Sequence, residues 1–316
     1  MPKFVFHEDR AQRVLIDGIH RAYKDQKFLY NKYHAVHGVA PQHCNLPKGV
    51  VLGSQKHVLF LFFTTLVTLQ SSSDEGFKRS VLLYEQFHGC FTEHSLLERV
   101  DGISTLEEIF KHVGFNKPKT WSGYWSECAE TLFHEYDGDP LCIIRDVKTV
   151  DGMLLYKKNA RKEGKSWWLN GYGPKLFSLF CIFCEELGLI EPVSDAIPVD
   201  VHLQRICLST GIVTTDVGKF GDTVLAEFLR KELTRFCRVN NIAPVDISHA
   251  MWFLGSKSCS KCNRVRGLKY HCPVFSLCTG SPPTKPYWRK GHWRTDLGSN
   301  ARGHPFYREH QYELFF

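Results

Sequence analysis

Two short segments carry the side chains best suited to chemistry: LNGYGPK, which ends in Lys175, and PVDVH, which contains Asp200. A neutral lysine amine is a nucleophile, and a fixed carboxylate can stabilise a developing positive charge. The two residues stand twenty-five positions apart. Folded elements must therefore bring them to one place if they act together.

The turn before Lys175 predicts a binding site for an anion. Gly171 and Gly173 can adopt backbone angles that other residues resist, and Pro174 suits the first position of a helix. A helix beginning here presents free N–H groups, which suit a DNA phosphate. The alternative is a plain turn between two helices, because a single Gly-x-Gly is a weak pattern.

Asp200 has two interpretations. It precedes an amphipathic segment and is therefore predicted as a helix N-cap, a position that aspartate favours. A capping carboxylate also keeps a fixed place, so Asp200 can take part in chemistry as well.

A cysteine cluster near the end of the chain predicts a metal site. The chain has twelve cysteines, and the only dense group is Cys259, Cys262, Cys272 and Cys278. Grouped cysteines in a reducing compartment typically bind a metal ion or cluster. The alternative is that these four are buried free cysteines. Cys181 and Cys184 lie in an apolar segment, and we predict that they are core residues.

The end of the chain is basic. The whole chain has a net charge of +7, while eleven Lys or Arg and three Asp or Glu lie from Lys257 onward, so the rest is nearly neutral. Three of these cations, Arg264, Arg266 and Lys269, lie within the cysteine cluster. A loop fixed by a metal would hold them against DNA phosphates, and the alternative is a solvated basic tail.

The composition is that of a globular protein. The chain has 316 residues, of which 43% are hydrophobic and 23% charged, enough for a full core. The N-terminus lacks the pattern of a signal segment, and the apolar run 58–69 is too short to cross a bilayer. We therefore expect an intracellular protein without a membrane partner.

Hydrophobic periodicity predicts a mainly helical chain. The run 56–70 is apolar almost all round, which predicts a buried central helix. Start and stop signals predict further helices at 76–88, 107–113, 118–136, 175–187, 201–210, 222–239 and 243–254. Segment 281–316, rich in Pro, Gly, Arg and aromatic residues, is predicted as a basic and aromatic C-terminal extension.

LNGYGPK followed by PVDVH resembles the helix-hairpin-helix DNA glycosylases, specifically the endonuclease III and 8-oxoguanine glycosylase group. The matching residues are Leu169, Gly171, Gly173 and Lys175, then Pro198, Val199, Asp200, Val201 and His202. The chain departs from the family at Asn170, where proline is usual, and at Tyr172, where a small apolar residue is usual. The Lys-to-Asp separation is also longer, and the resemblance covers roughly residues 56–280.

The resemblance implies base-excision repair: an N-glycosylase that flips a damaged, oxidised base out of DNA and then cleaves the abasic site by β-elimination. Asp200 would stabilise positive charge on the sugar, and Lys175 would attack C1′ to form a Schiff base. Gln70 would fill the gap left by the flipped base, and Gly171, Gly173 and His202 would contact DNA. The alternatives are a surface glutamine for Gln70 and a phosphate contact for Lys175.

The family also implies a cofactor at the cysteine cluster. Endonuclease III-like proteins carry a [4Fe–4S] cluster at this chain position, with the spacing C-x6-C-x2-C-x5-C. This chain has C-x2-C-x9-C-x5-C, which matches the final pair but suits Zn²⁺ as well. The expectation is a [4Fe–4S] cluster, with Zn²⁺ as the alternative.

The expected architecture is an all-α, two-lobed helix-hairpin-helix fold with a C-terminal four-cysteine metal loop. One domain would span 57–180 and end in the hairpin, and the other would join 1–56 with 190–280. The cleft between them would hold Lys175 and Asp200. The partner would be double-stranded DNA containing a damaged base or abasic site, bound by a monomer. The alternatives are a monofunctional glycosylase for a mismatched or modified base, and a non-catalytic DNA-binding module.

Overall fold

The computed structural model describes residues 2–33, 43, 46–68, 73–92, 105–259, 272–278 and 286–295. The chain forms two compact units. The middle unit is Ala35–Pro198, and the terminal unit joins Met1–His34 with Val199–Phe316. These boundaries differ from the predicted 57–180 and 1–56 plus 190–280, since residues 35–56 and 190–198 are assigned to the middle unit.

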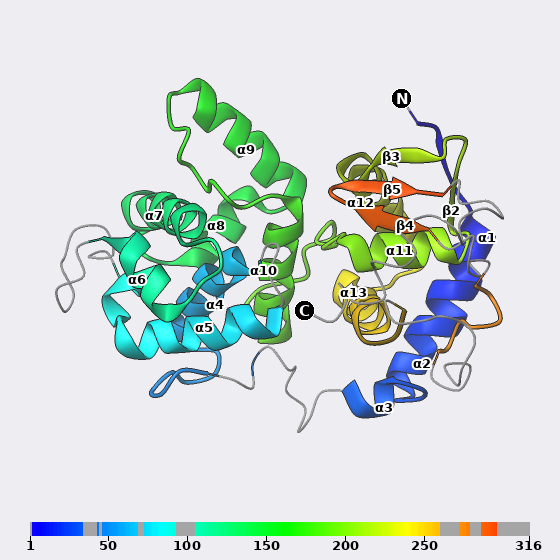
Figure 1. Cartoon of the computed structure of the whole chain (residues 1–316), viewed down its shortest axis with the longest axis horizontal. Helices are drawn as coiled ribbons and strands as arrows, with labels where there is room; N and C mark the ends of the chain where they lie inside the picture. Colours follow the sequence, from blue (N-terminus) through cyan, green and yellow to red (C-terminus); the bar gives the residue numbers. More distant parts are fainter. Residues whose placement is uncertain are drawn as a thin grey trace. The chain divides into compact units, whose positions relative to one another are not determined.

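The middle unit is helical in the residues that the structure describes. Its elements are α4 (Gln55–Val67), α5 (Ser73–Gln86), η3 (His88–Phe91), α6 (Leu106–Val113), α7 (Pro118–Glu135), α8 (Pro140–Val147), α9 (Val150–Lys162) and α10 (Pro174–Glu186). Helix α4 packs against α5, α7, α8 and α10, as Figure 1 shows. The predicted buried helix at 56–70 is therefore confirmed over Gln55–Val67.

Aromatic rings fill the core around α4. Phe63 stacks on Trp125 of α7 with ring centroids 4.5 Å apart, and Phe62 stacks on Tyr172 at 5.1 Å. Trp125 and Phe63 are fully buried. Aromatic pairs of this kind stabilise a core beyond the area they bury. The core thus ties the segment before α10 to the central helix.

The terminal unit combines helices with two small sheets. Its elements are β1 (Phe4–Phe6), α1 (Glu8–Ala11), the π-helix η1 (Gln12–His20), α2 (Arg21–Lys24), α3 (Tyr30–Tyr33), α11 (Val201–Ser209), β2 (Val213–Thr215), β3 (Lys219–Gly221), α12 (Asp222–Val239), α13 (Pro244–Phe253), the π-helix η5 (Leu254–Ser258), β4 (Tyr287–Arg289) and β5 (His292–Arg294). Figure 1 shows β3, β5 and β4 beside α11 and α12. The protein is mostly helical, as predicted, but the sheets were not expected.

The sheets were missed because each strand has only three residues, too few for an alternating pattern. β1 pairs antiparallel with β2, with Phe4 opposite Thr215. β5 pairs antiparallel with both β3 and β4, with Trp293 opposite Phe220. The β1–β2 and β3–β5 pairings join segments far apart in the sequence, which local periodicity does not reveal, whereas β4 and β5 form a local hairpin.

Residues 287–294, predicted as part of an extension, contribute to the core of the terminal unit. Trp293 is fully buried, and its Nε1 donates to Gln204 Oε1 of α11 at 2.6 Å. Trp288 Nε1 donates to Asp222 Oδ2 at the start of α12, at 2.9 Å. This hairpin therefore fixes α11, the helix that begins after Asp200.

Trp293→Ala is expected to lower the free energy of unfolding by about 3–5 kcal/mol, because it leaves a cavity and an unpaired Gln204 amide. Urea unfolding followed by circular dichroism measures the change. Trp293→Phe keeps most of the packing and should cost clearly less. Wild-type stability of Trp293→Ala would show that β5 contributes nothing to the core.

None of the helices in the described part of the chain is both long and apolar enough to cross a membrane.

Candidate functional site

Residues 163–173, called the hairpin from here on, join α9 to α10. Leu169 and Gly171 have positive φ angles of 43° and 90°, which turn the chain before Pro174 begins α10. A Cβ at Gly171 would lie 2.8–3.1 Å from Tyr124 of α7, so both the φ angle and the space require glycine. The predicted glycine turn with proline at the first helical position is confirmed.

The hairpin is fastened to α7 by side chains. Asn170 Nδ2 donates to Glu127 at 2.7 Å, and the N–H of Leu169 donates to Thr131 Oγ1 at 3.0 Å. Trp168 Nε1 donates to Glu135 at 2.9 Å. Each bond pairs a polar group that would otherwise lose water on folding.

The two departures from the family motif have structural uses here. Asn170 makes the bond to Glu127, which a proline lacks the donor to make. Tyr172 is buried, stacks on Phe62, and donates its hydroxyl proton to the Phe62 carbonyl at 2.5 Å. Both residues therefore anchor the hairpin to the middle unit.

Three carbonyl oxygens of the hairpin are also held by side chains. Lys157 Nζ of α9 donates to the carbonyls of Leu169 and Tyr172, each at 2.8 Å. The Cys128 thiol donates to the Asn170 carbonyl at 3.0 Å. The hairpin carbonyls are thus turned toward the protein.

Lys175 lies at the second position of α10 and is partly exposed. Its Nζ has no hydrogen-bond or ion-pair partner among the residues that the structure describes. The backbone N–H groups of Lys175 and Leu176 are likewise unpaired within these residues, whereas that of Phe177 bonds Gly173 O. The start of α10 therefore offers an amine and free N–H donors side by side.

Asp200 is the N-cap of α11. One oxygen, Oδ1, accepts from the N–H of His202 at 2.8 Å and from that of Leu203 at 3.0 Å. The residue is buried, with 9% of its surface exposed. The cap interpretation is therefore confirmed, and it fixes the carboxylate in one orientation.

Helix α11 is held on several sides within the terminal unit. It packs against α12, α13, η5 and β2. Its Ser209 carbonyl accepts from Cys278 Sγ at 3.3 Å, and Arg10 Nε donates to Thr210 O at 2.6 Å. His202, predicted as a DNA contact, packs against Gly255 and bonds Arg205. The start of α11 is consequently a rigid place for a carboxylate.

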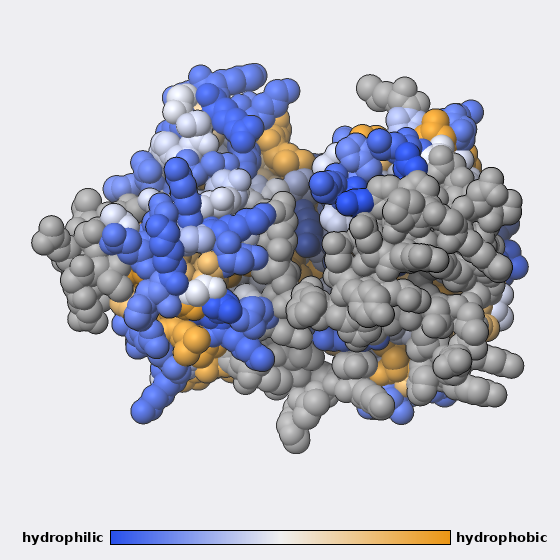
Figure 2. Space-filling view, in the orientation of Figure 1, coloured by the Kyte–Doolittle hydropathy of each residue, from blue (hydrophilic) through white to orange (hydrophobic). Residues whose placement is uncertain are grey.

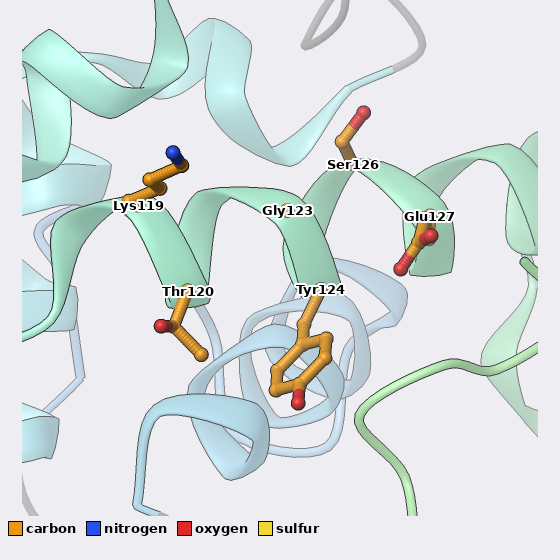
Figure 3. Close-up of a pocket in the computed structure, with 6 residues that line it drawn as sticks. All are labelled: Lys119, Thr120, Gly123, Tyr124, Ser126 and Glu127. Atoms are coloured by element: carbon orange, nitrogen blue, oxygen red, sulfur yellow. The ribbon is translucent and has the colours of Figure 1, made fainter.

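A shallow pocket lies on α7, next to the hairpin. Its lining residues are Lys119, Thr120, Gly123, Tyr124, Ser126 and Glu127. Figure 3 shows Thr120, Tyr124 and Glu127 pointing to one side of the helix and Lys119 and Ser126 to another. The polar groups do not converge on one point, so the pocket has no set of groups arranged for catalysis.

The metal prediction is only partly within the structure. Cys259 is the C-cap of η5, and Cys272 and Cys278 flank a turn that contacts Arg10 and Gly18, whereas Cys262 lies outside the described residues. Those described contain no group of three or more His, Cys, Asp or Glu side chains placed to hold a metal ion. The predicted DNA contacts Gln70, Arg264, Arg266 and Lys269 also lie outside the described residues.

Sequence reasoning missed the residues that support the hairpin, chiefly Lys157, Glu127 and Cys128. Lys157 stands in the run KKNARKEGK, a pattern typical of a solvated basic face. No local signal separates it from its neighbours, because its role depends on carbonyls twelve and fifteen residues away.

Comparison with known proteins gives no match, either to a protein-family model or to a curated protein.

Proposed function

We propose that the protein is a base-excision-repair DNA N-glycosylase with abasic-site lyase activity. The observation that carries the proposal is the start of α10, where an anchored hairpin leaves the Lys175 amine and two N–H groups unpaired in the described residues. Unpaired N–H groups at a helix start suit a phosphate, and an amine beside them suits attack on the adjoining sugar. The motif resemblance supplies the reaction class.

In this proposal Lys175 and Asp200 act on one flipped nucleotide. The Asp200 carboxylate stabilises the positive charge that develops at C1′ as the bond to the base breaks. The Lys175 amine then attacks C1′ and forms a Schiff base with the opened sugar, from which β-elimination breaks the 3′ phosphate bond. The fixed cap geometry of Asp200 supports this role, because a carboxylate held in advance need not reorganise during the reaction.

Borohydride trapping on duplex oligonucleotides tests the proposal. The substrates are DNA with thymine glycol, with 8-oxoguanine, with a plain abasic site and with no lesion. A covalent complex with a damaged base is expected and would name the oxidised-base class. No complex on any lesion, with intact DNA binding, would instead favour a monofunctional glycosylase or a DNA-binding module.

We also propose that Cys259, Cys262, Cys272 and Cys278 bind a [4Fe–4S] cluster, with the grouping of four thiols in the sequence as the support. The full chain, purified without oxygen, is expected to contain iron and sulfide and to absorb visible light. The Cys262→Ser variant is expected to lose the iron, the sulfide and this absorbance. Cys142→Ser, on α8 of the middle unit, is the matched control and should keep them. Zinc without iron would refute the iron–sulfur cluster. The absence of both metals would refute the metal site.

A further inference from the structure

Lys157 is the one lysine of α9 whose amine turns toward the protein in the described structure. Its neighbours Lys158 and Lys162 are exposed, and Figure 2 shows a largely hydrophilic surface over α9. Lys157 Nζ instead lies 2.8 Å from two carbonyl oxygens, those of Leu169 and Tyr172. The Tyr172 carbonyl would lose its hydrogen-bond donor without this ammonium, and the Leu169 carbonyl, which also accepts from the Tyr172 N–H at 3.0 Å, would lose its charged donor.

These two carbonyls bracket the turn of the hairpin. Leu169 has a positive φ of 43°, which a non-glycine residue rarely adopts, and Gly171 follows with 90°. Such angles persist only where the surroundings impose them. The ammonium holds both carbonyl oxygens toward α9 and so keeps the turn in this form.

We propose that Lys157 is a positioning residue for DNA binding: its ammonium group holds the hairpin in the form that accepts a DNA phosphate at the start of α10. The inference rests on the proposed function in one respect, that the hairpin binds DNA. Lys157 itself touches no substrate. It acts through the carbonyls of Leu169 and Tyr172.

The surroundings of Lys157 let this contact respond to pH. Burial, aided by the charge of Arg161 on α9, lowers the pKa of Lys157 to about 8, against the opposing effects of Cys128 and Glu127 on α7. Burial raises the pKa of the Cys128 thiol and of the Tyr172 phenol far above this range. Among these neighbours Lys157 is therefore the group expected to change charge between pH 7 and 9.

The expected effect is a loss of DNA affinity as pH rises. Lys157 is mostly protonated at pH 7 and mostly neutral at pH 9, and only the protonated form holds both carbonyls as a charged donor. If that form alone binds, the apparent Kd for duplex DNA should rise about tenfold over this interval. Fluorescence anisotropy at constant salt measures this Kd. A Kd that does not change between pH 7 and pH 9 would overturn the proposal.

Variants separate Lys157 from a general loss of charge. Lys157→Met should bind weakly with no pH dependence, and Lys157→Arg should restore affinity with a flat profile, because a guanidinium stays charged. Lys158→Met, an exposed neighbour on the same helix, removes equal charge and should keep the wild-type pH profile. A wild-type profile in Lys157→Met would overturn the proposal.

Hydrogen exchange without DNA gives a second readout. At pH 7, peptides covering 166–176 should exchange faster in Lys157→Met than in wild type or Lys158→Met. If these peptides exchange in Lys157→Met at the wild-type rate, the positioning role is overturned, even if the wild type binds DNA. Faster exchange in this variant, with no DNA binding by the wild type, would instead refute the proposed function and leave the hairpin contact in place.

Discussion

Lys175→Ala is expected to abolish borohydride trapping on abasic DNA, a fall of about a thousandfold or more, while duplex binding changes only a few-fold. The amine is the proposed nucleophile, and alanine offers no atom that can form a Schiff base. The side chain is partly exposed and makes no hydrogen bond or ion pair in the described structure. Its removal should therefore change the free energy of unfolding by less than about 0.5 kcal/mol.

Two further variants separate the nucleophilic role of Lys175 from the loss of a positive charge. Lys175→Arg keeps a positive charge for the phosphate but is not expected to trap, which separates charge from nucleophilicity. Lys158→Ala, exposed on α9, should trap as wild type does. Persistent trapping by Lys175→Ala would refute its assignment.

Asp200→Asn is the second substitution with a large expected effect. Asparagine caps helices as well as aspartate does, so the bonds to the N–H groups of His202 and Leu203 can remain. The carboxylate charge is lost, and base excision should slow by about 10²–10³-fold, a loss typical of removing one stabilising group. Single-turnover excision with the lesion identified by the trapping panel measures this rate.

The same variant has an internal control. Asp200→Asn should still trap on a preformed abasic site, because that substrate has already lost its base. Asp200→Ala removes the cap as well and should lower the free energy of unfolding by about 1 kcal/mol. Base excision at the wild-type rate by Asp200→Asn would leave Asp200 with only its structural role.

Much of the middle unit was predictable because its signals are local. The apolar run 56–70 indicated the helix that the core surrounds, and this is α4. Gly171, Pro174 and Asp200 each act on the backbone within a few residues, so their turn, helix start and cap could be predicted from neighbouring residues. The pairing of lysine and aspartate with a reaction came from the motif resemblance and stays a prediction.

Only the tertiary structure identified what holds these segments in place. The Lys157 contact, the Tyr172 anchor and the Trp293–Gln204 bond each join residues separated by twelve to one hundred and ten positions. The strands of the terminal unit have three residues each, and the β1–β2 and β3–β5 pairings join distant segments. Sequence periodicity reports which face of a local element is apolar, whereas these contacts depend on how the elements pack.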